Sequence, residues 1–190
     1  MDQDRLPAFF GYGSLVNRAT HDHVPGAPAR LDGWRRVWRQ TRLRPHAFLS
    51  VEAAPGAAID GLVAAVASGD WAALDRREAA YRRHLLSADC LAPAPVWAER
   101  VEIYAVDPAH GDPGATHPVL LSYLDAVVQG FFREFGPEGV ARFFATTVGW
   151  TSLIDDRAQP VYPRHQALAA RERKLVDDHA EALGLKRRGL

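Results

Sequence analysis

The sequence is poor in cysteine, because Cys90 is the only one among its 190 residues. A lone cysteine cannot form an intrachain disulfide, which suits a protein of a reducing compartment. Long hydrophobic runs are also missing, since none approaches the roughly 18 residues that indicate a membrane span. The N-terminal stretch 1–5 is acidic and has no apolar segment of the secretory kind. We therefore expect a cytoplasmic protein that does not associate with membranes.

The sequence has no excess of charge of either sign, because 23 Lys and Arg residues balance 23 Asp and Glu residues. A chain without an overall basic field can bind nucleic acid only through a local patch. The arginine-rich segment 35–44 is interpreted instead as a solvated strand face that can also receive an anionic substrate. Repeats are absent, and 47% of the residues are hydrophobic. These features predict one globular domain over residues 1–190.

The character of the sequence changes near residue 106. Strand-like apolar segments prevail before it, with a turn at Pro55-Gly56 and a helix over 71–86. The predicted strands are 7–11, 30–40, 47–51, 59–67 and 96–106. Helical periodicity prevails afterwards, with a break at Gly136-Pro137-Glu138. The helices predicted there are 118–135, 138–146 and 164–183. This order is typical of an α+β fold and not of regular strand–helix alternation.

A glycine-rich turn, Gly11-Tyr12-Gly13-Ser14, follows the first predicted strand. The dinucleotide-binding fingerprint fails at this turn because Val16 stands where its third glycine belongs, and the flanking residues do not fit a serine-hydrolase elbow. Ser14 is therefore a weak candidate for a nucleophile. Two interpretations stay open. The glycines serve only the backbone freedom of a tight turn, or successive N–H groups form a cradle for a small carboxylate.

An acidic residue, Glu78, lies among apolar residues in the predicted helix, which Asp70 can cap. At about 100° per residue, Glu78 falls within an apolar face of the helix. The other residues on this face are Trp71, Leu74, Tyr81 and Leu85. Burying an unpaired charge is costly, so Glu78 needs a partner or a function. Either it pairs with Arg82 one turn later, or a pocket raises its pKa for proton transfer.

These two stretches together resemble the signature of the gamma-glutamylcyclotransferase-like family. The family has Tyr-Gly-Ser-Asn/Leu after its first strand, then a glycine-bearing strand, then a helix with the pattern Leu-Asp-x-x-Glu-x-x-Tyr. This sequence has Tyr12-Gly13-Ser14-Leu15, then DGLVAAV at 60–66, then LDRREAAY at 74–81. The resemblance covers residues 7–106. Leu15 replaces the asparagine that is common in one branch of the family.

The resemblance implies a mixed β-barrel with surrounding helices, extended in this chain by a mainly helical segment over 107–190. It also implies an enzyme that needs neither cofactor nor metal. The α-amine of a γ-glutamyl amide attacks its own γ-carbonyl, which yields 5-oxoproline and releases an amine. Glu78 is then the general acid/base, and Tyr81 borders the pocket. The loop residues implied to bind substrate are Tyr12, Gly13, Ser14 and Leu15. Glutathione, γ-glutamyl dipeptides and γ-glutamylamines all fit this reaction.

Other interpretations of the sequence stay open. The same fold can serve as a non-catalytic module that binds a small ligand, or the helical C-terminal half can be an interaction surface. His21-Asp22-His23 suggests a metal site only weakly, because no third ligand stands nearby. Cys90 with His84 suggests a thiol nucleophile, although a buried cysteine more often serves packing. The segment 155–164 is a lid, a dimer contact or a packing element.

Overall fold

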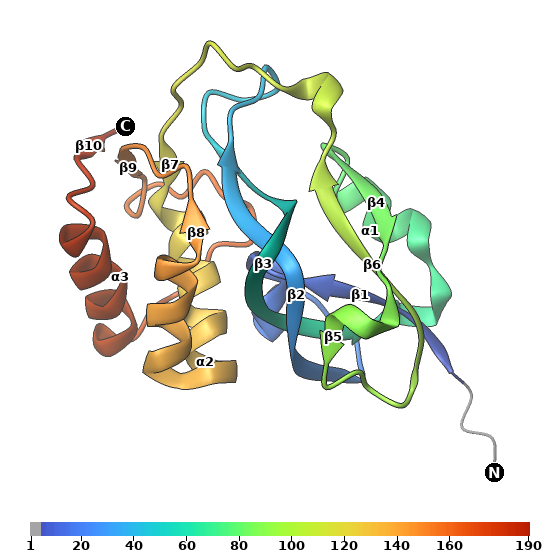
Figure 1. The fold of residues 1–190 in the computed structure, drawn as a ribbon. Helices are drawn as coiled ribbons and strands as arrows, with labels where there is room; N and C mark the ends of the chain where they lie inside the picture. The colour runs from blue at the N-terminus through green and yellow to red at the C-terminus, as the bar shows by residue number, and fades with distance from the viewer. Residues whose placement is uncertain (1–4) are drawn as a thin grey trace.

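The strands of the first half and the helices of the second half form adjacent layers (Figure 1). The computed structural model describes residues 5–190, without the side chains of Ala67 and Ala88. Met1–Asp4, which belong to the acidic N-terminal stretch, lie outside the described residues. The strands are β1 (Leu6–Gly11), β2 (Gly26–Arg39), β3 (Phe48–Ala65), β4 (Tyr81–Leu85), β5 (Leu91–Ala92), β6 (Ala98–Val106), β7 (Val119–Leu120), β8 (Thr147–Val148), β9 (Leu153–Asp155) and β10 (Arg187–Gly189). The helices are α1 (Trp71–Arg77), α2 (Leu121–Ala145) and α3 (Ala170–Ala182).

The main sheet has the strand order β4-β6-β1-β3-β2-β5, and β8 adds to β2. Strand β1 lies inside the sheet, antiparallel to β3 and parallel to β6, because its residues Ala8–Phe10 are apolar and fully buried. The sheet bends strongly along β2 and β3 (Figure 1). No described backbone pairing joins its edges β4 and β5, so the expected barrel is open. The expected α+β class is confirmed.

Strands β2 and β3 pair along almost their whole length, and the turn expected at Pro55-Gly56 is wrong. Their register shifts so that Asp32 pairs with Ala58, whereas Trp34 pairs with Ala53. The extra residues form a bulge in β3, with a φ of +81° at Gly56. Glycine tolerates this backbone conformation, and pairing resumes on both sides. One long bent strand therefore replaces the two separate strands expected over 47–51 and 59–67.

Helix α1 is shorter than the helix expected over 71–86. Asp70 caps it as predicted, because its carboxylate accepts the backbone N–H of Ala73 at 3.1 Å. The helix ends at Arg77, and residues 81–85 form β4, which pairs antiparallel with β6. The free edge of β6 offers backbone partners that outweigh the helix propensity of this stretch. The predicted face that combined Glu78 and Tyr81 on one helix is therefore wrong.

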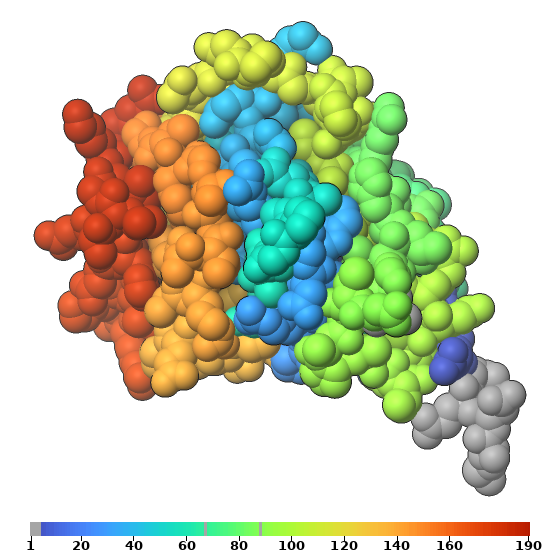
Figure 2. Space-filling view, viewed as in Figure 1, coloured from blue at the N-terminus to red at the C-terminus, as the bar shows by residue number. Residues whose placement is uncertain are grey.

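Helix α2 contains the break that the sequence predicts. Gly136 has a φ of +67°, and Pro137 follows it within the helix. Helix α3 begins at Ala170 instead of 164, where the Glu172 carboxylate accepts the Ala169 N–H at 2.8 Å. In Figure 2, α3 lies on one flank, and the end of α2 separates it from β2 and β3. Among the described residues, no helix is long and apolar enough to cross a membrane.

A fully buried arginine, Arg36, connects β2 to the end of α2. Its guanidinium donates hydrogen bonds to the hydroxyls of Thr146 and Thr147 and to the carbonyl of Asp60, at 2.7–3.1 Å. It also lies 5.0 Å from the ring centroid of Phe131. Burial lowers the pKa of Arg36 to about 9, and the Asp60 carboxylate opposes that change. The two layers are therefore joined by a polar contact within an apolar core.

Candidate active site

Two adjoining cavities lie where β1 ends, beside α1 and the beginning of α2. The larger has a volume of about 150 Å³, and the smaller about 30 Å³. Both are lined by Ser14, Leu49, Glu78, Tyr81 and Tyr123. The smaller is also lined by the remaining predicted loop residues, Tyr12, Gly13 and Leu15. The structure thus brings every residue of the predicted site to the walls of these cavities.

The glycines of the loop are required by space. Gly13 has a φ of −125° with a ψ of −126°, a combination outside the main regions that residues with a side chain adopt. A Cβ on Gly13 would lie 2.7 Å from the Tyr123 hydroxyl oxygen, and a Cβ on Gly11 would lie 2.7 Å from the Leu15 Cβ. Close packing is therefore a reason for glycine at both positions, in addition to the conformation of the turn. Their small size lets Tyr123 and the turn at 14–16 approach the end of β1.

The hydroxyls of Tyr12 and Tyr81 are bound to the backbone of the sheet. Tyr12 donates to the carbonyl of Tyr104 in β6 at 2.6 Å, and its oxygen lies 3.5 Å from the carbonyl of Leu49 in β3. Tyr81 donates to the same Leu49 carbonyl at 2.9 Å. Burial raises the pKa of both phenols well above the usual value, so they stay protonated. Tyr12 closes the gap between β3 and β6 beyond the end of β1.

Glu78 stands at the C-terminal cap of α1, immediately before the turn into β4. Its backbone N–H donates to Leu74, and its carbonyl accepts the N–H of Tyr81 at 2.8 Å. Its carboxylate accepts a hydrogen bond from Arg77 Nε at 3.0 Å. The alternative pairing with Arg82 is wrong, because Arg82 forms an ion pair with Asp107 at 2.5 Å. Ending the helix turns the Glu78 side chain to the cavity wall.

The charge of Glu78 is set by opposing effects. Burial raises its pKa above the usual value, whereas the positive charges of Arg77 and Arg164 lower it, and burial prevails. Its own negative charge in turn helps to raise the pKa of Tyr12, Tyr81 and Tyr123. The result is a carboxylate that exchanges a proton closer to neutral pH than an exposed glutamate does.

A chain of hydrogen bonds connects Glu78 to the glycine-rich loop. Arg77, which holds the Glu78 carboxylate, also donates to the backbone carbonyl and the hydroxyl of Thr20, at 2.9 and 3.2 Å. The Thr20 hydroxyl lies 2.9 Å from the carbonyl of Ser14, to which it donates. The position of the carboxylate is therefore fixed relative to the loop through side chains that are mostly shielded from solvent.

Four cavity residues come from the C-terminal half and were not predicted from the sequence, namely Leu120 in β7, Tyr123 in α2, and Tyr162 and Arg164 in the segment 155–164. The rings of Tyr123 and Tyr162 meet edge to face, with centroids 5.0 Å apart. No motif in the sequence singles them out, but the two tyrosines belong to a group that the structure brings together. The chain has five tyrosines, and all of them line one or both cavities.

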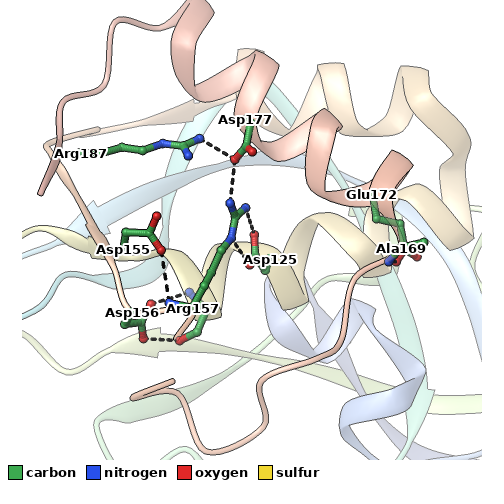
Figure 3. A network of polar contacts seen from close by, with 9 residues as sticks. Asp125, Asp155, Asp156, Arg157, Ala169, Glu172, Asp177 and Arg187 are labelled. Atoms are coloured by element: carbon green, nitrogen blue, oxygen red, sulfur yellow. Dashed lines mark hydrogen bonds and ion pairs between the residues drawn. The ribbon is translucent and has the colours of Figure 1, made fainter. Parts of the chain in front are cut away.

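The segment 155–164 is fastened to the helices by buried polar contacts (Figure 3). Asp156 accepts the backbone N–H of Ser122 at 2.7 Å, close to the N-terminus of α2. Arg157 binds both carboxylate oxygens of Asp125 at 2.6–2.7 Å and one oxygen of Asp177 at 2.9 Å. Of the three interpretations of this segment, the structure supports packing, and it adds a part in the cavity wall.

The weaker candidates lie outside these two cavities. The Nε2 atom of His21 is 3.0 Å from the carbonyl of Leu15, and its ring packs edge to face on Phe9. Burial lowers the pKa of His21 to about 4, so it is neutral at pH 7. Within residues 5–190, no three potential metal-ligating side chains form a group. Neither Cys90 nor His84 lines the cavities described above.

Similarity to known proteins exists at the level of structure. No family model matches the sequence, and no curated protein matches it. A solved structure titled gamma-glutamyl cyclotransferase is similar with a TM-score of 0.55 at 14% identity, over 90% of this chain and 98% of that one. The chain has a gamma-glutamylcyclotransferase-like fold. This confirms the predicted resemblance at the level of the fold.

Two further structures share this fold. An uncharacterised protein from Homo sapiens has a TM-score of 0.58 at 14% identity, over 92% of this chain and 99% of that one. The protein YkqA from Bacillus subtilis has a TM-score of 0.52 at 15% identity, over 72% of this chain and 52% of that one. The first two matches cover at least 90% of this chain, so the gamma-glutamylcyclotransferase-like fold includes most of residues 107–190.

Proposed function

We propose that this protein is a gamma-glutamylcyclotransferase, which cyclises a γ-glutamyl amide or peptide to 5-oxoproline and releases an amine or amino acid. The proposal rests on the position and the surroundings of the Glu78 carboxylate. Its carboxylate, with a pKa raised by burial, lines the same small cavity as Ser14 and is linked to the Ser14 loop through Arg77 and Thr20. A polar group of this kind inside a small cavity is typical of a reaction site.

The proposed reaction begins with proton removal. At neutral pH the α-amine of the substrate is an ammonium, which cannot attack until a base takes a proton, and Glu78 is that base. The free amine attacks the γ-carbonyl carbon, which forms the C–N bond of the five-membered ring. The amide C–N bond then breaks. Two protons leave the attacking nitrogen and two reach the leaving nitrogen, with Glu78 carrying them one at a time.

The cavity would contribute orientation and charge stabilisation. Ring closure is favoured when the amine and the carbonyl are held together in one conformation. A cavity of about 150 Å³ is a suitable size for a γ-glutamyl group. In the proposal, the loop Tyr12–Leu15 binds the substrate through its N–H groups, and Tyr81 borders it. No cofactor is required, because the nucleophile and the leaving group belong to one molecule.

The direct test is to measure 5-oxoproline after incubation with glutathione, γ-glutamyl dipeptides and γ-glutamylamines. We expect Glu78→Gln to lower kcat by about 10²-fold or more, the usual contribution of a general acid/base. Glu99→Gln is the matched control, because Glu99 is exposed on β6 and does not line the two cavities. A wild-type rate in Glu78→Gln would show that the assigned role is wrong.

One observation favours a second candidate function, a non-catalytic module that binds a small ligand. The ion pair between Arg77 and Glu78, at 3.0 Å, occupies part of the carboxylate that the reaction needs. Calorimetry separates the two functions. If γ-glutamyl amides bind to the wild-type protein but none yields 5-oxoproline, the protein is a binding module.

A further inference from the structure

Arg164 differs from the other arginine of the larger cavity in having no bound partner. The guanidinium of Arg77 is occupied by Glu78 and Thr20. The guanidinium of Arg164 is exposed and makes no hydrogen bond or ion pair with the part of the chain that the structure describes. It is close enough to Glu78 to lower the pKa of that carboxyl. Arg164 therefore offers its N–H donors to a ligand.

Arg164 is an exposed residue in the wall of the larger cavity, which Ser14 of the loop also lines. It does not line the smaller cavity, where Tyr12–Leu15 lie. It does line an outer groove of about 410 Å³ together with Arg77, Asp22 and Asp70. The negative charges of these two acidic residues make the outer groove less favourable for an anion than the larger cavity beside Arg164.

The backbone that carries Arg164 is held in place. It directly follows Pro163, which restricts the chain. The same segment is anchored upstream by the contacts of Asp156 to Ser122 and of Arg157 to Asp125. Next to it, Tyr162 is fixed by its ring contact with Tyr123. These contacts fix the backbone from which the exposed Arg164 side chain extends at the cavity.

The charges around the cavity favour an anionic ligand. The ionisable residues of its wall include Glu78, Arg77, Arg164 and His46. Burial lowers the pKa of His46, so it adds no positive charge at neutral pH. Arg77 and Glu78 neutralise each other, which leaves the charge of Arg164. In the proposed function, the loop and Glu78 are engaged by the glutamyl group and its amine, which leaves Arg164 as the cationic residue of this wall that is free to contact the leaving group.

We propose that Arg164 is a specificity-determining residue, which favours γ-glutamyl amides whose leaving amine carries a carboxylate next to the amide nitrogen. This inference rests on the proposed function for the identity of the ligand. An arginine binds a carboxylate through two parallel N–H donors, which an uncharged amine cannot engage. Substrates that release an α-amino acid are therefore preferred over those that release a simple alkylamine.

The test compares two ligands of nearly equal shape, γ-glutamylalanine and γ-glutamylethylamine, which differ by one carboxylate. Their affinities are measured by calorimetry in the Glu78→Gln protein, in which turnover is expected to be about 10²-fold slower or more. We expect γ-glutamylalanine to bind about tenfold more tightly, the effect of one charge-assisted contact at an exposed arginine. Adding Arg164→Ala removes this preference, and Arg164→Lys keeps part of it. Arg188→Ala, on exposed β10, is the charge-matched control that retains it.

The outcomes distinguish this inference from the proposed function. Equal affinity for the two amides, or a preference that survives Arg164→Ala, would overturn the role of Arg164. Failure of both amides to bind would overturn the role of Arg164 together with the proposed function. A preference in binding that depends on Arg164, without any 5-oxoproline from the wild-type protein, would support Arg164 and refute the cyclotransferase activity alone.

Discussion

At the scale of single residues, Glu78 combines two properties that oppose each other. A base must be deprotonated to accept a proton, yet a carboxylate that is too acidic accepts it weakly. Burial raises the pKa of Glu78, and Arg77 and Arg164 limit the rise. The Arg77 contact at 3.0 Å therefore does more than hold the carboxylate in place, because it also sets the pH at which the residue can work.

The first prediction at this scale concerns pH. The rate kcat/KM falls on the acid side as Glu78 becomes protonated, and this acid limb lies at a higher pH than an ordinary glutamate would give, because burial raises the pKa of Glu78. Arg77→Gln removes a positive charge that lowers the pKa of Glu78, so the acid limb moves to higher pH. Arg77→Lys keeps the charge and moves it less. Measuring kcat/KM between pH 4 and 9 checks this, in steps of about half a unit.

The pH profile separates the effect of the Arg77 charge on the pKa of Glu78 from the structural effect of losing the Arg77 side chain. Loss of the Arg77 contacts to Thr20 can lower kcat/KM at every pH, but this loss alone does not change the pH at which the acid limb lies. An unchanged limb in Arg77→Gln, or one displaced to lower pH, would show that the charge of Arg77 does not control the protonation of Glu78.

At the scale of elements, the end of β1 and the beginning of α2 approach each other because Gly13 has no side chain. A Cβ at this position would lie 2.7 Å from the Tyr123 hydroxyl oxygen and 3.1 Å from Leu49 Cδ2. Tyr123 cannot easily move away, because Tyr162 and Trp38 pack edge to face against it, with centroids 5.0 and 5.9 Å away. This close approach forms one wall of both cavities.

The second prediction follows from this approach. Gly13→Ala is expected to lower the free energy of unfolding by about 1–3 kcal/mol, the usual cost of overpacking a buried contact. Tyr123→Phe removes the hydroxyl and makes room, so the double variant recovers part of the loss. Gly189→Ala is the control, because no atom lies within 4 Å of its added Cβ. Urea unfolding of the wild-type protein and the four variants (Gly13→Ala, Tyr123→Phe, the double variant and Gly189→Ala) measures these changes. Equal stability of Gly13→Ala and the wild-type protein would contradict the steric argument.

The sequence predicted some elements well because their signals are local. The Asp70 cap and the break at Gly136-Pro137 depend on residues that are adjacent in the chain, and both are confirmed. The stretch 78–85 shows where local signals fail. Its composition favours a helix, but pairing with β6 makes it a strand, and that partner stands about 20 residues away.

The residues of the candidate site also fall into two groups, those that the sequence could predict and those that it could not. The loop Tyr12–Leu15 and Glu78 carry a recognisable order and spacing, so the sequence alone could single them out. Tyr123, Tyr162 and Arg164 carry no motif, and only folding brings them to the cavity. Their place in the cavity wall depends on the buried ion pair of Arg157 and on the start of α2. No spacing in the sequence relates these features to Glu78.

At the scale of the whole molecule, one ion-pair network joins the segment 155–164 to both C-terminal helices. Arg157 contacts Asp125 of α2 through two hydrogen bonds and Asp177 of α3 through one (Figure 3). Arg187, next to the C-terminus, also contacts Asp177, at 2.5 Å. The side chains of Asp125 and Arg157 are only 7% and 12% exposed, so water replaces their contacts poorly. The network therefore determines where Tyr162 and Arg164 stand at the cavity.

The last prediction tests this network. Asp125→Ala leaves the buried guanidinium of Arg157 with one carboxylate partner instead of two, and it removes two hydrogen bonds at once. We expect the free energy of unfolding to fall by about 3–5 kcal/mol, the usual cost of breaking a buried pair from one side. Lys174→Ala breaks the exposed pair with Asp178 and serves as the control, with no measurable change expected.

The Asp125→Ala and Lys174→Ala variants also test whether the ion-pair network affects ligand binding at the candidate site. Because Asp125 holds the segment that carries Tyr162 and Arg164, Asp125→Ala is expected to weaken binding of γ-glutamylalanine at a temperature where the protein is still folded. Thermal unfolding defines that temperature, and calorimetry measures the affinity there. If Asp125→Ala binds as tightly as the Lys174→Ala control, the cavity wall does not depend on the network. If it binds more weakly while folded, an ion pair outside the cavity lining determines the shape of the candidate site.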